Sequence, residues 1–320
     1  MNISTINKSL GLSKCLINEA YQKNWFKLFV LKKYSGLECS LPIALKIIQY
    51  CNKQNGSFGW CVNLGAGANY FSGFFNEFGA FKIFDDKRCV LAGSGELASE
   101  VLMVEGGYLV SGSWGKATGA LHATYFTCNG KLPNGEVVSL AIKSCDVKII
   151  SDWQLCGMKN SSSFGFSAHK AFVPEDHIFK INKCHELSSY SIHKLPFENF
   201  AQFLMAASII GLAEGIIEKL DKIELKEVAQ EAVISLKMFC NEGEFKMAEL
   251  AEKTWLTLQT HNHEVDSLEI EKMVKWIGKT LFNLVNQVYF DVGLVMADEN
   301  KPVHTQYKDF MLAIQHSIFK

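Results

Sequence analysis

The sequence changes its pattern twice along the chain, and this order of patterns constrains the fold more than any other feature. From residue 13 to about 80, and again from 196 to 320, apolar residues recur near the helical period of about 3.6 residues. From residue 88 to about 182, short runs rich in Val, Ile, Tyr, Phe and Thr alternate with Gly and Asn turns. The sequence therefore predicts an α+β multidomain chain, with an N-terminal helical domain at 1–87, a middle β domain at 88–190 that forms a barrel or a sandwich, and a C-terminal helical bundle at 191–320.

Local patterns place individual elements inside these zones. Ser40 is suited to cap a helix that has Pro42 in its first turn and runs to about Asn52. Strands are expected at Tyr108–Ser111, Ala123–Thr127, Val137–Ile142, Val147–Ile150 and Phe164–Ser167. Helices of the bundle are expected at Phe197–Asp221, Glu224–Phe239, Lys246–Thr260, Leu268–Val292 and Tyr307–Phe319.

The charge balance and the hydropathy exclude several classes of protein. Lys and Arg total 32 and Asp and Glu total 33, so the formal net charge is −1 and no basic excess is available for nucleic acid or an anionic membrane. The apolar run Phe200–Ala213 is shorter than the roughly 20 residues that cross a bilayer. We expect this run to form a buried core helix, and we expect neither a nucleic-acid nor a membrane partner.

The start of the chain and its cysteines favour a cytoplasmic location. The first fifteen residues lack the basic start and the apolar stretch of a signal peptide. Ten cysteines are scattered from Cys15 to Cys240 without a C-x-x-C pair, and such a spacing is not that of a disulfide framework. We expect free thiols in a reducing compartment.

Common nucleotide, hydrolase and metal motifs are not found in the sequence. Gly65-Ala-Gly67 lacks the preceding strand and the third glycine of a dinucleotide-binding fingerprint. There is no P-loop, no H-E-x-x-H and no G-x-S-x-G. His261 and His263 could bind a metal, but no nearby Cys or carboxylate completes a ligand set. We therefore expect no metal site.

The most informative segment is 92–123, which reads AGSGELASEVLMVEGGYLVSGSWGKATGALHA. It resembles the middle domain of the acyl-CoA dehydrogenase superfamily, especially its class D branch, the two-component flavin-dependent monooxygenases. There, GGY-x-V-S-G-x-W is followed by a small-residue turn and an H-A or H-S pair. Ser151–Ser163, with D-W-x-x-x-G-M, and Ala171–Asp176, with F-V-P-E, are similar to two further stretches of that domain. The resemblance covers nearly the whole chain and implies the acyl-CoA dehydrogenase-like fold, in which the middle domain at 88–190 is a β-barrel.

The C-terminus separates two branches of this superfamily. Lys308-Asp309 is followed by Gln315-His316, which is similar to the ending of the monooxygenases, with the His seven residues after the Asp. Many acyl-CoA dehydrogenases instead carry a catalytic Glu eight residues after that Asp. The equivalent residue here is Ser317, which cannot act as a carboxylate base. Two roles stay open for His316: an acid or base in catalysis, or a cap of the terminal helix.

The resemblance implies a flavin cofactor, either FAD or reduced FMN, and a set of residues that serve it. The implied catalytic residues are His316 and Thr118. The implied cofactor-binding residues are Ala92, Gly93, Ser94, Trp114, Thr118, Gly119, Trp153 and Ser163. Trp114 and Trp153 have an equally simple alternative role in the core of the β domain.

The chain also departs from the family pattern. It is shorter than typical members by some tens of residues, Lys116 stands where an aromatic residue is usual, and Lys159 replaces an Arg. Thr305 and Lys308 stand where arginines are common. Lysine cannot clamp a phosphate through two parallel hydrogen bonds as arginine does, so these changes bear on flavin binding.

The sequence thus predicts a flavin-dependent oxidoreductase, as the oxygenase component of a two-component hydroxylase that uses reduced flavin and O2. The resemblance implies a small-molecule or acyl substrate, a flavin reductase or electron-transfer partner, and a homodimer or homotetramer. Two alternatives remain. The first is an acyl-CoA dehydrogenase-type FAD enzyme that oxidises a CH–CH bond of an acyl thioester. The second is a non-catalytic member that lost the flavin.

Overall fold

A computed structural model of the chain describes residues 11–184, 190–260 and 264–320. His261 and His263 lie outside the described residues, and no group of metal-ligating side chains occurs within them. Contacts divide the chain into two compact units. The sheet unit contains the segment that ends at Cys39 together with Leu64–Gln154 and Lys159–Phe197, and the helix unit contains Ser40–Asn63, Leu155–Met158 and Glu198–Lys320. The division into three domains stays a prediction.

The sheet unit is built on one seven-stranded sheet with the order β5-β6-β2-β1-β3-β4-β7. Neighbouring strands are antiparallel except β1 and β3, which are parallel. The five expected strands all fall on strands of this sheet. The elements of the unit are α1 (Lys14–Gln22), α4 (Glu77–Phe84), β1 (Leu91–Val104), β2 (Gly107–Ala117), β3 (Tyr125–Lys131), β4 (Val137–Lys143), β5 (Lys148–Ile150), β6 (Phe164–Pro174) and β7 (Ile178–Phe179).

The sheet is open, so the expected β-barrel is wrong. Its two outer strands pair on one side only in the described part of the chain, β5 with β6 and β7 with β4. A barrel requires the first and last strands to pair with each other along their length. With three residues in β5 and two in β7, the edges offer too little backbone for a closing ladder.

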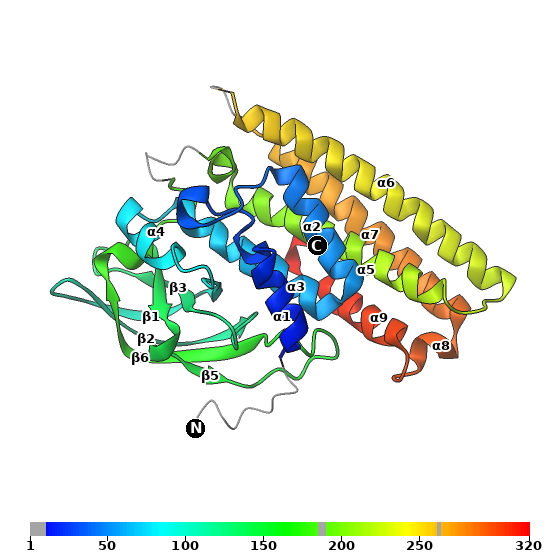
Figure 1. Cartoon of the computed structure of the whole chain (residues 1–320), viewed down its shortest axis with the longest axis horizontal. Coiled ribbons are helices and arrows are strands. Elements are labelled where there is room, and N and C mark those ends of the chain that lie inside the picture. The colour runs from blue at the N-terminus through cyan, green and yellow to red at the C-terminus, as the bar shows by residue number, and fades with distance from the viewer. Residues whose placement is uncertain (1–10, 185–189, 261–263) are drawn as a thin grey trace. The chain divides into compact units, whose positions relative to one another are not determined.

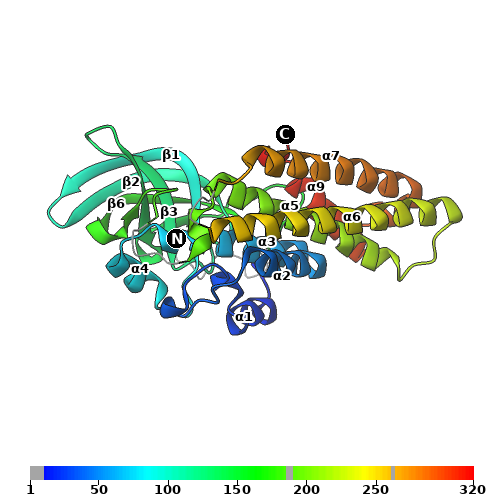
Figure 2. The ribbon, with the colours of Figure 1, turned by 90° about the horizontal axis from the view of Figure 1, so that it is seen from above.

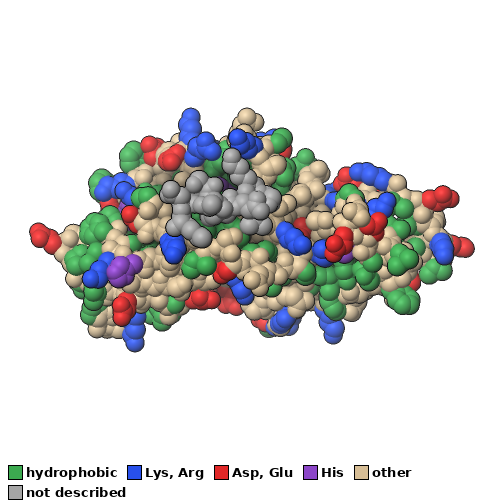
Figure 3. Space-filling view, turned by 90° about the horizontal axis from the view of Figure 1, so that it is seen from below, with side chains coloured by type: hydrophobic (Ala, Val, Ile, Leu, Met, Phe, Trp, Pro, Cys, Tyr) green, Lys and Arg blue, Asp and Glu red, His purple; other side chains and the backbone are tan. Residues whose placement is uncertain are grey.

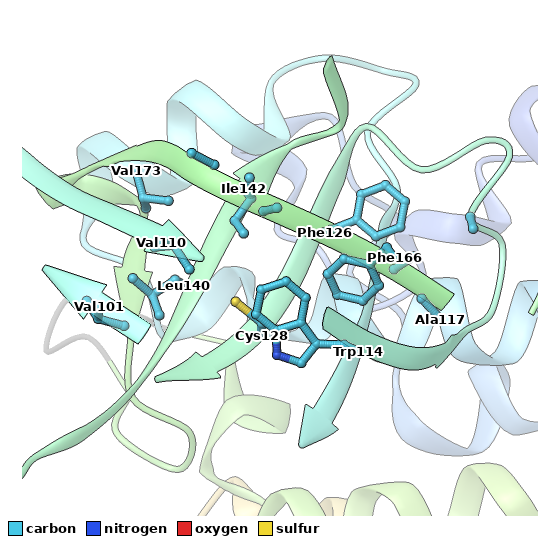
Figure 4. Close-up of a cluster of buried hydrophobic side chains, with 14 of the residues drawn as sticks. Val101, Val110, Trp114, Ala117, Phe126, Cys128, Leu140, Ile142, Phe166 and Val173 are labelled. Atoms are coloured by element: carbon cyan, nitrogen blue, oxygen red, sulfur yellow. The ribbon is translucent and has the colours of Figure 1, made fainter. Parts of the chain in front are cut away.

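Packed side chains, rather than closure, hold the sheet together. Trp114 of β2 and Phe126 of β3 lie against Phe166 of β6, with both ring pairs 4.8 Å apart between centroids. Figure 4 shows these rings in one cluster with aliphatic side chains such as Val110 and Leu140. The cluster joins strands that are distant in the sequence.

The helix unit is a bundle around one apolar helix. Its elements are α2 (Leu41–Gln54), the first part of α3 (Gly56–Asn69), α5 (Phe197–Leu220), α6 (Glu227–Leu258), α7 (Ser267–Val292), α8 (Leu294–Ala297) and α9 (Pro302–Ala313). Helices α6 and α7 run antiparallel, side by side, in both views of the ribbon (Figures 1 and 2). The two helices expected at Glu224–Phe239 and Lys246–Thr260 form the single helix α6, and Gly243 continues it without a break.

Helix α5 is long and apolar enough to cross a membrane by length and composition, but 89% of its apolar window is buried inside the protein. Phe200, Ile209 and Ile216 are fully buried. The helix is therefore the core of the bundle, as the sequence predicts for Phe200–Ala213.

The surface and the thiols also agree with the sequence. On the face drawn in Figure 3, Lys and Arg side chains are interspersed with Asp and Glu side chains, in keeping with the net charge of −1. All ten cysteines lie within the described residues and are free thiols.

Candidate active site

Three buried hydroxyls form a chain between the residue after strand β2 and the segment before strand β6 of the sheet unit. The Oγ1 atom of Thr118 lies 2.8 Å from Oγ of Ser163, which lies 2.7 Å from Oγ of Ser161. The exposed fractions of Thr118, Ser161 and Ser163 are 8%, 0% and 2%. The sequence predicted Thr118 and Ser163 as site residues but missed Ser161. No local pattern marked it, because Ser162 between the two serines has a φ of +50° and the segment is not an extended strand.

The backbone holds the two segments of this hydroxyl chain together. The N–H of Gly119 donates to the carbonyl oxygen of Ser161 at 2.9 Å, and the N–H of Ala120 donates to that of Ser162 at 3.1 Å. Gly119 has a φ of +80°, in the left-handed region that favours glycine. A Cβ atom there would lie 2.9 Å from Nε2 of His122, so the turn after Thr118 requires a glycine.

His122 adds a neutral imidazole to the same turn. Burial lowers the pKa of His122 to about 4, so the ring is uncharged at neutral pH. Its Nε2 atom is buried and has no hydrogen-bond partner among the described residues. The ring lies 5.3 Å from that of Phe26. A buried polar atom without a partner is suited to a bound water or to a polar atom of a ligand.

The two predicted tryptophans differ in their surroundings. Trp114 is 2% exposed and stacks on Phe166 within the sheet core, so its surroundings match the core alternative (Figure 4). Trp153 is half-buried and packs against the same cluster. A flavin contact from either ring stays a prediction.

The segment expected to be a flavin loop is part of strand β1. Ala92 pairs with Phe126 and Gly93 with Thr127, and the register of the ladder shifts between Gly93 and Leu97. A Cβ atom on Gly93 would lie 2.0 Å from Oγ1 of Thr127, so the close approach of the strands requires this glycine. Ser94 lies in the irregular stretch, where its Oγ accepts from the N–H of Glu96 at 3.3 Å. Flavin binding by Ala92, Gly93 and Ser94 stays a prediction, from an irregular strand rather than a loop.

His316 lies in the helix unit, at the end of the last helix. Its Nδ1 accepts the N–H of Ile318 at 3.4 Å and so caps the short turn Ser317–Phe319. The capping alternative for His316 is therefore observed. Burial lowers the pKa of His316, so the ring is neutral at pH 7 and carries its proton on Nε2. Nε2 is not used by the cap and can donate to a substrate.

The polar groups of the sheet unit fit the ring system of a flavin. That ring has an uncharged polar edge, which hydroxyls, backbone N–H groups and a neutral imidazole can hydrogen-bond. Thr118, Ser163 and the unpartnered Nε2 of His122 supply such groups around one turn. Arg88 is the only arginine of the sequence, and its guanidinium lies over the ring of Tyr21 at 4.8 Å, so arginine offers the phosphate end of a flavin at most this one side chain.

Comparisons with known proteins place the fold in a class. No family model matches the chain. The crystal structure of the HsaA monooxygenase from Mycobacterium tuberculosis matches with a TM-score of 0.88 at 15% identity, over 98% of this chain and 89% of that one. XiaF from Streptomyces sp., solved with FADH2 and glycerol, matches with a TM-score of 0.87 at 17% identity, over 99% of this chain and 87% of that one. These likenesses show the acyl-CoA dehydrogenase-like fold.

Sequence comparisons point to one branch of that class. The chain is 29% identical over 196 residues to the pigment production hydroxylase of Rhodococcus sp., covering 58% of this chain and 51% of that protein. It is 22% identical over 203 residues to the flavin-dependent monooxygenase oxygenase subunit HsaA of Mycobacterium tuberculosis, covering 60% of this chain and 52% of that protein. Each match thus spans about half the length of the curated relative. These relatives confirm the resemblance to class D flavin-dependent monooxygenases.

Proposed function

We propose that the protein is the oxygenase component of a two-component hydroxylase that uses reduced flavin and O2. The observation that carries this proposal is the buried row of hydrogen-bonded hydroxyls of Thr118, Ser163 and Ser161. It occurs in a protein whose sequence is similar to those of such oxygenase subunits. Reduced flavin, when bound, supplies the activation of O2. Thr118, Ser163 and Gly119 are the proposed flavin contacts, with Ala92, Gly93, Ser94, Trp114 and Trp153 as further candidates.

The hydroxyl chain can adapt its hydrogen bonding without moving heavy atoms. In each pair of oxygens either atom can be the donor, so rotation of the three hydroxyls reverses the direction of the chain. Thr118 can therefore donate to, or accept from, a group placed against it. Because the three side chains are buried, such a bond is stronger than the same bond in water. Water is also kept away from the reacting atoms.

His316 is the proposed acid or base. In its neutral form with the proton on Nε2, His316 can donate a hydrogen bond to the substrate. To act as a base through Nε2, the ring must take the tautomer with its proton on Nδ1, which gives up the cap on Ile318 and leaves Nε2 free to accept a proton. The half-buried position of the ring gives it a defined orientation through the cap on Ile318.

The two alternatives are less well supported. A dehydrogenase of this fold needs a base to remove an α-proton, and Ser317 at the expected position cannot supply one. The relatives carry the names of hydroxylases and monooxygenases. A non-catalytic role is disfavoured by the buried Nε2 atom of His122, because a buried polar atom without a partner among the described residues costs stability unless a ligand or water binds it.

The proposed partners follow from the proposed reaction. A separate flavin reductase must supply the reduced flavin, and the substrate is a small molecule with an aromatic or acyl group. We place the protein in the cytoplasm, where its ten free thiols stay reduced.

A homodimer or homotetramer is also proposed, through the outer face of α6. The segment Phe200–Ala213 is buried within the chain and so is not free for this role. Ile234, Met238, Phe245 and Leu256 lie on one face of α6 at helical spacing and are 56%, 68%, 70% and 55% exposed. Sedimentation of the wild type and of Phe245→Lys tests this: dissociation in the variant supports the face, and an unchanged mass rejects it.

Anaerobic titration of the protein with reduced FMN and reduced FAD, followed by mixing with O2, tests the proposed function. Binding of either flavin with a transient, oxygen-dependent absorbance is the expected result. Binding of oxidised FAD with no such transient would favour the dehydrogenase alternative. No binding of any flavin, and no rise in melting temperature with flavin, would leave the non-catalytic alternative.

A further inference from the structure

Three segments of the helix unit meet at the carboxylate of Asp309. This residue lies in α9 and is 2% exposed. The backbone N–H of Met158 donates to its Oδ1 at 2.5 Å, and the backbone N–H of Ser57, at the start of α3, also donates to the carboxylate. One buried carboxylate therefore joins α9, α3 and the segment Leu155–Met158.

Two glycines allow this junction to form. A Cβ atom on Gly56 would lie 2.4 Å from Oδ2 of Asp309. A Cβ atom on Gly157 would lie 2.3 Å from the carbonyl oxygen of Lys308 and 3.1 Å from Cα of Asp309. Both backbones thus pack directly against α9, so the junction is built for close contact rather than formed by chance.

Nearby positive groups and burial act in opposite directions on the pKa of Asp309. The start of α3 favours a negative charge, because the N–H groups of a helix N-terminus point outward. Lys219 of α5 and Lys308 act in the same direction. Burial dominates and raises the pKa of Asp309 to about 6. The carboxylate is ionised at neutral pH and becomes protonated in mild acid.

Along the chain, the junction is close to the serine segment and to His316. Gln154 and Lys159 belong to the sheet unit, whereas Leu155–Met158 belongs to the helix unit. Ser161 and Ser163 follow Met158 by three and five residues, and Met158 itself has a φ of +53°. His316 follows Asp309 by seven residues. The backbone that Asp309 holds at Met158 therefore leads into the serine segment within three residues.

We propose that Asp309 is a positioning residue for the flavin site, because it anchors the backbone from which the Ser161–Ser163 segment starts to the helix that leads to His316. This inference rests on the proposed function. It adds that the ionised carboxylate is the form that holds the site. Protonation removes one acceptor site and the charge, so the anchor weakens in mild acid.

The variant Asp309→Asn tests the proposal, with Asp298→Asn as its matched control. The amide accepts only through its oxygen, so one of the two backbone bonds of Asp309 is lost. Asp298 also accepts a backbone N–H, that of Asn300 at 3.0 Å, but this bond is local and joins no distant segment. The affinity for reduced FMN and reduced FAD is measured from about pH 5 to about pH 8, so that the series crosses the raised pKa of the Asp309 carboxyl group.

The wild type and Asp298→Asn are expected to bind reduced flavin several-fold more weakly at the acid end, with a midpoint near the pKa of Asp309, about 6. Asp309→Asn is expected to bind about ten-fold more weakly at neutral pH, the effect of one lost charge-assisted bond, and to lack the pH step. An affinity and pH profile equal to those of the wild type would overturn the proposal.

Hydrogen exchange of the flavin-free proteins separates this inference from the proposed function. The amide of Met158 is expected to exchange at least about ten times faster in Asp309→Asn than in the wild type. If the wild type binds no flavin, the proposed function fails, and this exchange alone decides on the anchor. Equal exchange in both proteins would reject the anchor whatever the flavin does.

Discussion

The hydroxyl oxygens of Thr118 and Ser163 lie 2.8 Å apart, although 45 positions separate the two residues in the sequence. Thr118 follows the end of β2, and Ser163 precedes β6, the strand that pairs with β2. The pairing of Ala117 with Phe164 brings the two hydroxyls together. The sheet topology thus creates a buried polar site where two segments join.

Replacing Ser163 with Ala is expected to weaken both the fold and the flavin site. It removes the hydroxyl shared by Thr118 and Ser161, and the free energy of unfolding should fall by about 1–2 kcal/mol. Affinity for reduced flavin should fall about ten-fold if the chain contacts the cofactor. Urea unfolding and flavin titration measure the two effects. Ser113→Ala, at an exposed position of β2, is the control and should change stability by less than about 0.5 kcal/mol.

Replacing Gly119 with Ala tests the turn that follows Thr118. The φ of +80° and the 2.9 Å approach of a Cβ atom to His122 Nε2 both oppose a side chain. We expect a loss of about 1–3 kcal/mol in the free energy of unfolding. Gly115→Ala is the matched control, since a Cβ atom there meets nothing within 4 Å. Equal stability of the two variants would show that the turn tolerates a side chain.

Most of the architecture could be predicted from the sequence, because strand and helix patterns are local. The strand at Val137–Ile142 and the helix at Phe197–Asp221 are found close to their expected bounds. Strand β1 was not expected, because Gly93, Gly95 and polar residues such as Ser94 and Glu96 hide its alternation. The sequence also could not predict that the sheet is open, since closure depends on how far β5 and β7 extend.

The candidate site could be predicted only where a motif marks it. Thr118, Gly119 and Ser163 were found through the resemblance, and the structure gathers them at one turn. Ser161, His122 and Asp309 had no assigned role, because burial and backbone contacts decide what they do. Such contacts join distant segments and leave no periodic trace in the sequence.

Buried histidines should make the protein labile in mild acid. Burial lowers the pKa of His193 and that of His122 to about 4, so the folded state binds fewer protons than the unfolded state between about pH 6.5 and that value. The contribution of each neutral ring to the free energy of unfolding is fully present above the pKa of histidine in the unfolded state. It is lost as pH falls through this interval, by about 3 kcal/mol for His193. Urea unfolding at a series of pH values measures the slope.

The variant His193→Phe tests how much of the loss of stability in acid comes from His193. The ring of His193 lies among aromatic side chains, 5.4 Å from Tyr70 and 6.2 Å from Phe74, so a phenyl ring suits the surroundings. The variant should lose stability less steeply in acid than the wild type. An unchanged slope would show that His193 does not titrate on unfolding.

Replacing His316 with Ala tests its place in the proposed reaction. The variant should keep its affinity for reduced flavin, since the proposed flavin contacts lie on other residues, and should lose hydroxylation of a panel of phenols.

His316→Gln separates the two roles of the ring, because its amide can accept from Ile318 and still donate, but cannot transfer a proton at neutral pH. If the ring only caps the final turn, His316→Gln should hydroxylate like the wild type and His316→Ala should be less stable by about 1 kcal/mol. If Nε2 transfers a proton, both variants should lose hydroxylation. The wild type should then lose activity as the pH falls through the lowered pKa of His316, because the protonated ring cannot accept a proton and its Nδ1 no longer accepts the cap.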